Sequence, residues 1–275
     1  MKVLLILAGR ELRDGLRNRW IAAAVLLLAT LALSLAFLGS APVGAVKAAA
    51  FDITIASLAS LTVYLLPLIA LMLAYDAFVG EAERGTLLLL LAYPVARWQV
   101  VLGKFLGHTA ILALAILLGY GVVLLGVSLA GESSPGDWRA FAALMASSLL
   151  LGSAFLGLGY LPSVLVRERA TAAGMAIALW LLFVVLYDLA LLGLLVADEG
   201  QVIGQGLITA LLLVNPTDAY RLFNLSGSDG VSLVSGMVGT GAGTGFGPGL
   251  PFLVMLAWVA LPLTAAVAVF RRKEI

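Results

Sequence analysis

The chain has 275 residues and a mean hydropathy of +1.13, and 63% of its residues are hydrophobic whereas only 11% are charged. Because the apolar residues are spread over the whole length, this composition excludes an ordinary soluble domain and predicts an all-α, polytopic membrane protein. The net charge of +1 gives no reason to expect a nucleic-acid partner, and the absence of cysteine excludes disulfides, thiolate metal sites and thiol nucleophiles.

Residues 1–19 precede the first long apolar run. Ala8, Leu12, Leu16 and Trp20 recur at helical spacing, and the arginines of this segment occupy the other faces. This pattern is typical of an amphipathic helix lying in the membrane interface, although a simple anchor that orients the chain by its positive charges explains the arginines nearly as well. The following apolar run is too long for a signal peptide and has no small-residue cleavage pattern, so we expect the segment to be retained.

Six predominantly apolar runs, the fifth of which contains Asp188, are long enough to cross the hydrocarbon core. An unpaired backbone amide in lipid costs several kcal/mol, so each run is predicted to be a helix, and at 1.5 Å per residue each can span about 30 Å. The expected spans are approximately 20–38, 53–75, 105–130, 140–161, 171–196 and 250–270. The apolar stretch at 202–214 is shorter and is predicted to be an interfacial or buried helix outside the membrane.

The distribution of basic residues supports six crossings. With six spans, 13 of the 16 lysines and arginines fall on one side, and only Lys47, Arg139 and Arg221 fall on the other. Basic residues favour the cytoplasmic side, so both termini are predicted to be cytoplasmic. A seventh span at 202–214 would export the basic residues at 271–273, and the charge rule argues against it.

A charged, turn-marked segment at 76–104 separates the second and third spans. Glu81, Glu83 and Arg84 make it hydrophilic, Gly85 and Pro94 mark turns, and Leu87–Leu91 form an apolar stretch too short to span a membrane. These features predict a cytoplasmic loop containing a short amphipathic helix at the membrane surface.

Catalytic and metal-binding patterns are missing from the sequence. Residues 80–86 read G-x-x-x-x-G-T, but they lack the phosphate-binding lysine and follow a membrane helix, so the similarity to a nucleotide-binding loop is accidental. His108 is the one histidine, and an interfacial hydrogen bond is a better interpretation than metal ligation. We therefore expect a non-catalytic subunit without a metal or cofactor of its own; ATP hydrolysis, if used, belongs to another chain.

Asp188 lies within the fifth predicted span. A charged carboxylate at mid-membrane costs about 2.5 to 3.5 kcal/mol on insertion scales, so it needs a partner or water. Two interpretations stay open: a role in conduction or gating, and a structural hydrogen bond with the acid protonated, made to Tyr187 of a second copy or to nearby Ser and Thr.

Residues 197–249 form the one long segment predicted outside the membrane on the periplasmic side. Its second half, from Ser226, is dominated by Gly, Ser and Thr and is predicted to be either a flexible linker or a surface ordered by a partner. Two small-residue pairs, Gly103/Gly107 and Ser153/Gly157, indicate close helix packing without indicating which helices touch.

The topology and the 76–104 segment together resemble the ABC-2 type permeases of ATP-binding-cassette transporters. The resemblance rests on E-x-E-x-G-T-L-x5-Y-P-x2-R-x5-G-K, which runs from Glu81 to Lys104. More narrowly, RELRDGLRNRW at 10–20, the stretch at 57–81 and GKFLGH at 103–108 are similar to the permeases of nitrous oxide reductase maturation systems. This similarity covers most of the chain, so residues 1–275 are expected to form a single transmembrane domain.

The resemblance implies a homodimer in the bacterial inner membrane that binds a cytoplasmic ABC ATPase dimer (NosF-like), in which ATP and Mg are held, and a periplasmic copper-handling protein (NosD-like). It assigns ATPase coupling to Glu81, Glu83, Arg84, Gly85, Thr86, Leu87, Pro94 and Arg97. Because the spans lack soft metal ligands, we favour mechanical transmission over copper transport; export of a sulfur species is the rival. A generic exporter of lipid, glycan or drug, and an ion-coupled transporter or channel using Asp188, remain alternatives.

Overall fold

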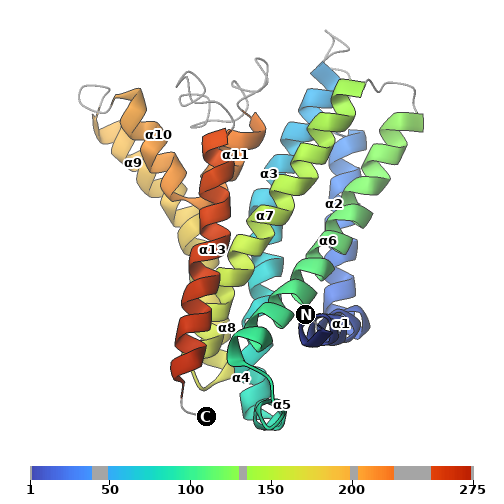
Figure 1. Ribbon diagram of the computed structural model, residues 1–275. Helices are drawn as coiled ribbons and strands as arrows, with labels where there is room; N and C mark the ends of the chain where they lie inside the picture. Colours follow the sequence, from blue (N-terminus) through green and yellow to red (C-terminus); the bar gives the residue numbers. More distant parts are fainter. Residues whose placement is uncertain (1, 39–48, 130–134, 199–203, 226–248, 274–275) are drawn as a thin grey trace.

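The computed structural model describes residues 2–38, 49–129, 135–198, 204–225 and 249–273 (Figure 1). Every regular element among these residues is helical. The elements are α1 (Lys2–Arg17), α2 (Arg19–Leu38), α3 (Ala49–Ala74), α4 (Asp76–Glu83), α5 (Thr86–Leu91), α6 (Arg97–Leu129), α7 (Pro135–Leu165), α8 (Arg169–Leu181), the π-helix η1 (Leu182–Leu186), α9 (Tyr187–Asp198), α10 (Gln205–Val214), α11 (Pro216–Leu225) and α13 (Gly249–Arg272).

The helices confirm a polytopic membrane architecture. Five segments are long and apolar enough to cross a bilayer, namely Thr54–Glu83, Arg97–Gly126, Trp138–Leu165, Arg169–Asp198 and Gly249–Arg272. α1 and α2 together give a sixth candidate, which is bent by 72° where the two helices meet. A helix bent this far from the crossing that follows it has the geometry expected of an interfacial helix.

The two chain ends and the short helix α5 lie at the same end of the bundle (Figure 1). We call this the α5 end. The segment at 76–104 was expected to be a loop with one short helix. Instead, α4 extends the candidate span of α3 to Glu83 and α6 begins at Arg97, so only residues 84–85 and 92–96 lie between helices.

α7 occupies the centre of the bundle because its glycines let neighbouring helices approach closely. A Cβ atom on Gly159 would lie 2.7 Å from the Cβ of Ala74 on α3, and one on Gly157 would lie 3.3 Å from Pro262 on α13. Gly157 of the predicted Ser153/Gly157 pair is therefore a packing site for the last helix, as small residues are in membrane helices generally.

The other predicted pair explains how α1 docks. A Cβ atom on Gly103 would lie 2.6 Å from Leu7, and one on Gly107 would lie 2.5 Å from the Cβ of Glu11. These glycines of α6 thus form the groove in which the interfacial helix lies, and α1 joins the bundle at the α5 end.

The segment after the fifth span contains a helix, as predicted. Residues 202–214 were expected to form an interfacial or buried helix outside the membrane, and the described part of this stretch contains α10, which runs back beside α9 (Figure 1). Its location outside the membrane stays a prediction. The Tyr187 hydroxyl donates to the Leu211 carbonyl at 2.7 Å. At the start of α11, the side chains of Asn215 and Thr217 donate to the carbonyl of Phe183, at 2.9 and 3.1 Å. Phe183 lies in η1, and a π-turn leaves carbonyls without the usual helical partner. These buried polar side chains therefore hold the α10–α11 junction against the middle of the span.

Asp188 also has a partner that the sequence did not indicate. Its Oδ2 atom lies 2.6 Å from Nη1 of Arg221 on α11, and the same nitrogen donates to Oδ1 of Asp218 at 2.8 Å. This ion pair within the chain was in neither interpretation of Asp188, and a hydrogen bond to Tyr187 of a second copy stays a prediction. Within the segment predicted to be periplasmic, 197–249, residues 204–225 form a helical hairpin that packs on the bundle. Residues 226–248 lie outside the described part of the chain.

Candidate functional site at the α5 end

A short helical hairpin, α4–α5, forms the far tip of the molecule (Figure 1). Gly85 permits the turn between the two helices because its φ is +71°, a conformation that side chains disfavour. The hydroxyl of Thr86 closes the turn by donating to the carbonyl of Glu81 at 3.2 Å. Leu87 is buried beneath the turn and anchors α5.

An apolar surface on this tip has no covering element among the described residues. Leu89 is 68% exposed and Tyr93 is 70% exposed, and Leu88 and Pro94 are exposed beside them. We call these four residues the tip surface. Exposed apolar residues gathered at one end of a molecule are typical of an interaction site.

The tip is joined firmly to the bundle through α4. The hydroxyl oxygen of Ser163 on α7 accepts hydrogen bonds from the backbone N–H groups of Phe78 and Val79, at 3.0 and 3.3 Å. The ring of Phe78 packs at 5.2 Å from that of Tyr160 and 5.1 Å from that of Phe270. A side-chain cap for the first N–H groups of α4 and an aromatic core behind them make α4 continuous with α7 and α13.

Ion pairs join α4 to the start of the fifth span. Asp76 lies in a two-point contact with Arg169, with distances of 2.6 Å to Nε and 2.9 Å to Nη2. The carboxylate of Glu83 accepts the backbone N–H of Arg169 at 2.8 Å. Arg84 reaches Asp76 only at 3.8 Å. Glu83 is therefore engaged with α8, whereas Arg84 keeps most of its guanidinium free.

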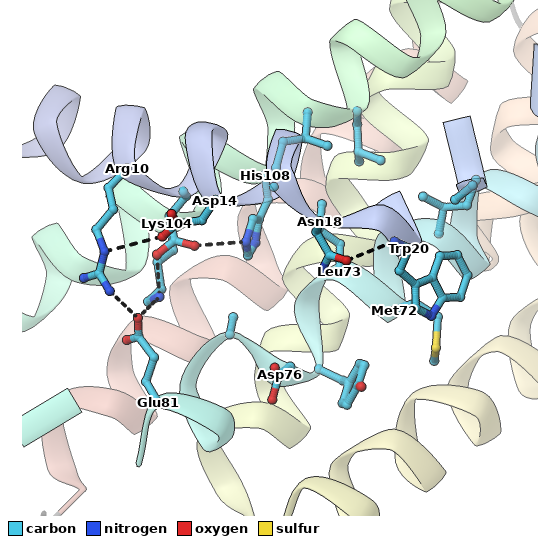
Figure 2. A pocket seen from close by; sticks show the side chains of 18 of the residues that line it. Arg10, Asp14, Asn18, Trp20, Met72, Leu73, Asp76, Glu81, Lys104 and His108 are labelled. Atoms are coloured by element: carbon cyan, nitrogen blue, oxygen red, sulfur yellow. Dashed lines mark hydrogen bonds and ion pairs between the residues drawn. The ribbon is translucent and has the colours of Figure 1, made fainter. Parts of the chain in front are cut away.

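A buried charge cluster lies on the inner side of α4 (Figure 2). Nζ of Lys104 is 2.6 Å from Oε1 of Glu11 and 3.0 Å from Oε1 of Glu81, and the Lys104 side chain is only 3% exposed. His108 contacts Glu11 through Nε2 at 3.4 Å and Tyr160 through Nδ1 at 2.8 Å. The cluster, defined as Glu11, Glu81, Lys104, His108 and Tyr160, ties α1, α4, α6 and α7 together.

The electrostatics of the cluster favour the charged form of Glu11. Burial alone would raise the pKa of Glu11, but the hydrogen bond with His108 and the positive charge of Lys104 outweigh it and lower the pKa to about 2. The cluster is thus a set of ion pairs in a poorly hydrated site, where loss of one partner costs more than at a surface.

Arg97, at the start of α6, binds the end of the last helix. Its Nη1 atom donates to the carbonyl of Phe270 at 3.0 Å and to that of Arg271 at 3.3 Å. These are the last carbonyls of α13, which lack partners within the helix. Arg97 therefore caps the final helix and holds the start of α6 against it.

The eight predicted coupling residues are thus brought to one end of the molecule but do not form one surface. Arg84 and Pro94 are exposed at the tip, Glu83 caps α8, and Glu81 and Leu87 are buried. Sequence reasoning missed Glu11 and Lys104 as partners of Glu81. The expected hydrogen bond of His108 is present, and the four-residue spacing of Lys104 and His108 on α6 was the signal that could have indicated a cluster. Among the described residues no group of His, Cys, Asp and Glu could hold a metal ion.

Comparison with known proteins identifies the family. The family model described as ABC-2 family transporter protein matches residues 5–275. This chain belongs to the ABC-2 transporter family. The permease is 49% identical to the "Probable ABC transporter permease protein NosY" of Stutzerimonas stutzeri, in an alignment of 269 residues that covers 97% of each chain. It is 47% identical over 277 residues to the protein of the same name from Pseudomonas aeruginosa, which covers 100% of each chain. The resemblance stated from the sequence is confirmed, and the protein is a multi-pass membrane permease of an ABC transporter.

Proposed function

We propose that this permease transmits ATP-driven motion from a cytoplasmic ABC ATPase dimer to a periplasmic copper-handling protein, in the maturation of the copper–sulfur centre of nitrous oxide reductase. The single observation that carries the proposal is an exposed apolar tip surface on a hairpin joined to five helices of the bundle, α1, α6, α7, α8 and α13. ATP and Mg belong to the NosF-like ATPase in this proposal, and the permease takes part in no chemical step. The proposed partner on the opposite side is NosD-like.

The tip surface suits a docking role because it combines an apolar contact area with a neighbouring positive charge. Leu88, Leu89, Tyr93 and Pro94 offer apolar contact area, and Arg84 adds a positive charge that fixes orientation. Leu87 is an internal anchor of the hairpin, not a contact residue. The proposed coupling role of Arg97 is to keep α13 attached to the base of the tip.

Transmission requires that the tip move the bundle rather than bend against it. Ser163 and Phe78 fix α4 to α7, Asp76 and Arg169 fix it to α8, and the charge cluster fixes it to α1 and α6. A displacement of α4 therefore reaches both the interfacial helix and the fifth span. Packed helices transmit such displacements because they rearrange between discrete states rather than deform continuously.

A homodimer gives the second half of the proposed pathway. The Arg169–Asp198 and Gly249–Arg272 spans bury little of their surface, 11% and 17% of their most apolar windows, so they are available to lipid or to a second copy. α9 and α10 lie at the opposite end from the tip (Figure 1), where a periplasmic partner would bind.

Asp188 is held by Arg221 and is no longer an isolated acid, so the observation that favoured an ion-coupled transporter is weakened. Export of a sulfur species through the dimer remains the rival.

The test is to change the tip without changing the bundle. Leu89→Asp and Arg84→Glu should each reduce co-purification of the ATPase with the permease and abolish permease-dependent maturation of the reductase. Arg139→Glu reverses an exposed arginine at the opposite end and is the matched control. Full ATPase retention and full reductase activity in both tip variants would contradict the proposal.

A further inference from the structure

The interfacial helix α1 has one side that packs on the bundle and one side that is exposed. Leu7 and Glu11 lie against Gly103 and Gly107 of α6, so the side of α1 that carries them is covered. α1 lies at the α5 end of the bundle, beside the base of α2 and α6 (Figure 1). The proposed function gives the exposed side of this helix no role.

The exposed side combines apolar and basic side chains. Leu5, Ile6 and Leu16 are 61 to 70% exposed, and Arg13 and Arg17 are exposed as well. Arg13 lies two turns after Ile6 and one turn before Leu16 and Arg17, and Leu5 and Leu16 are about three turns apart, so these side chains share one side of the helix. We call these five residues the α1 surface.

The arginines of the α1 surface are not neutralised by the described part of the chain. The two acidic residues of α1, Glu11 and Asp14, are each paired with another basic side chain, at 2.6 and 3.6 Å. Arg13 and Arg17 form no ion pair with any described residue, and neither does Arg19 at the start of α2. The α1 surface therefore carries a net positive charge that is open to an outside partner.

The position of α1 indicates that this partner is a membrane. α1 is bent by 72° from α2, and the two together form a candidate span, so α1 lies across the entrance to that span. Trp20 is exposed near the bend, and tryptophan is enriched at membrane interfaces. Exposed leucines beside arginines on one helix are typical of segments that lie among lipid headgroups. A protein partner would not require leucines at the level where the chain enters the bilayer.

The unpaired arginines favour lipids with a net negative charge. Each lysine or arginine close to an anionic membrane surface strengthens binding roughly fivefold. A zwitterionic headgroup carries an ammonium that opposes the attraction of its phosphate, whereas an anionic headgroup carries no opposing charge. The planar guanidinium fork of arginine also suits phosphate, because it can bind two oxygens at once.

We propose that the α1 surface binds anionic phospholipids of the leaflet at the α5 end. Arg13 and Arg17 contact the phosphates, and Leu5, Ile6 and Leu16 enter the layer just beneath the headgroups. The lipids thereby hold α1 in the plane of the membrane on one side, while α6 holds it on the other. Binding of this kind selects the charge of the headgroup, which goes beyond lying in the interface, and it does not require the ATPase.

Competition between two lipids on the purified full-length permease tests this selectivity. In native mass spectrometry, phosphatidylglycerol should bind in preference to phosphatidylethanolamine of identical chains. Arg13→Gln combined with Arg17→Gln should reduce the preference on the order of tenfold, because two of the attracting charges are lost. Arg13→Lys combined with Arg17→Lys should keep most of it. Arg139→Gln, which removes an exposed arginine at the opposite end, should leave it unchanged.

A fluorophore at position 16 locates the bound lipid. Because the chain contains no cysteine, Leu16→Cys can be labelled at this position alone and reconstituted in lipid nanodiscs. Phosphatidylglycerol brominated near the start of its acyl chains should quench the fluorophore more strongly than phosphatidylethanolamine brominated at the same positions. The difference should disappear when Arg13→Gln and Arg17→Gln are added.

Three results would overturn the proposal. Equal quenching by the two lipids would show that the α1 surface does not select headgroup charge. A preference for phosphatidylglycerol that survives the loss of both arginines would place the lipid elsewhere. Fluorescence that is insensitive to lipid charge but changes when the ATPase is added would assign the α1 surface to a protein partner. Because Arg13 and Arg17 are exposed, these variants should fold like the unaltered permease.

Discussion

Replacing Lys104 by methionine should destabilise the permease far more than replacing any exposed lysine. Lys104 places one ammonium between the carboxylates of Glu11 and Glu81, at 2.6 and 3.0 Å, in a site that is nearly inaccessible to water. Removing one partner of a buried ion pair typically costs about 3 to 5 kcal/mol, because the remaining charge stays buried and unpaired. Here two carboxylates are left, and the expected loss of unfolding free energy lies in the same range.

The assay is reversible unfolding of the purified chain in detergent, compared with Lys2→Met. Lys2 is exposed, so its replacement should change stability by less than about 0.5 kcal/mol. A double-mutant cycle with Glu11→Gln isolates the pair: the double variant should lose less stability than the sum of the two single variants. Equal stability of Lys104→Met and Lys2→Met, or strict additivity in the cycle, would refute the reasoning.

The cluster also makes stability depend on pH with a defined sign. The pKa of Glu11 falls from 4.5 to about 2 on folding, so Glu11 stabilises the native state above pH 4.5 and this contribution is lost as the pH falls toward 2. The shift corresponds to roughly 3 kcal/mol. Glu11→Gln should therefore flatten the pH dependence of stability between these limits, and an unchanged slope would contradict the assignment.

Three further variants test other contacts. Arg97→Ala should lower stability by about 1 to 3 kcal/mol and increase proteolysis of the C-terminal end, since the last carbonyls of α13 lose their donor; unchanged protease resistance would argue against the cap. Gly107→Val should undock α1 at a cost of about 1 to 3 kcal/mol, measured by thermal unfolding, whereas Gly121→Ala, with no atom within 4 Å of the new Cβ, should be tolerated. Asp188→Asn should lower the stability of the hairpin by about 1 to 3 kcal/mol. The same substitution should cost less stability when Arg221→Gln is already present. Loss of reductase maturation without any loss of stability would favour a gating role for Asp188 instead.

Much of the fold could be predicted because the bilayer restricts the choices. Backbone groups in lipid must be paired within the segment, so long apolar runs had to be helices, and the charge distribution predicts an even number of them. The small-residue pairs on α6 and α7 indicated close packing, but their partners, α1 and α13, depend on tertiary arrangement. The turn at Gly85 and the short α5 were also visible in the sequence.

The helix at 202–214 was predicted, but its return along the fifth span and the hairpin that it forms with α11 were not, because a short apolar run does not indicate its packing partner. Asn215 and Thr217 are buried, and their side chains donate hydrogen bonds to the carbonyl of Phe183. A π-turn within an apolar run has no clear sequence signal, and neither does the pairing of Asp188 with Arg221 across 33 residues. For the charge cluster, the spacing of Lys104 and His108 on α6 was a partial signal, but its other members come from three further helices whose packing the sequence does not indicate.

The central claim is that the tip surface faces the cytoplasm and contacts an ATPase. Because the chain contains no cysteine, a single Leu89→Cys substitution gives an unambiguous probe. In inverted membrane vesicles that contain the ATPase, the cysteine at position 89 should form a crosslink to the ATPase subunit. In intact spheroplasts it should stay unlabelled when an impermeant maleimide is added outside. Arg139→Cys should be labelled from outside the spheroplasts and should form no crosslink. Labelling of Leu89→Cys from outside, or an absent ATPase crosslink, would contradict the account.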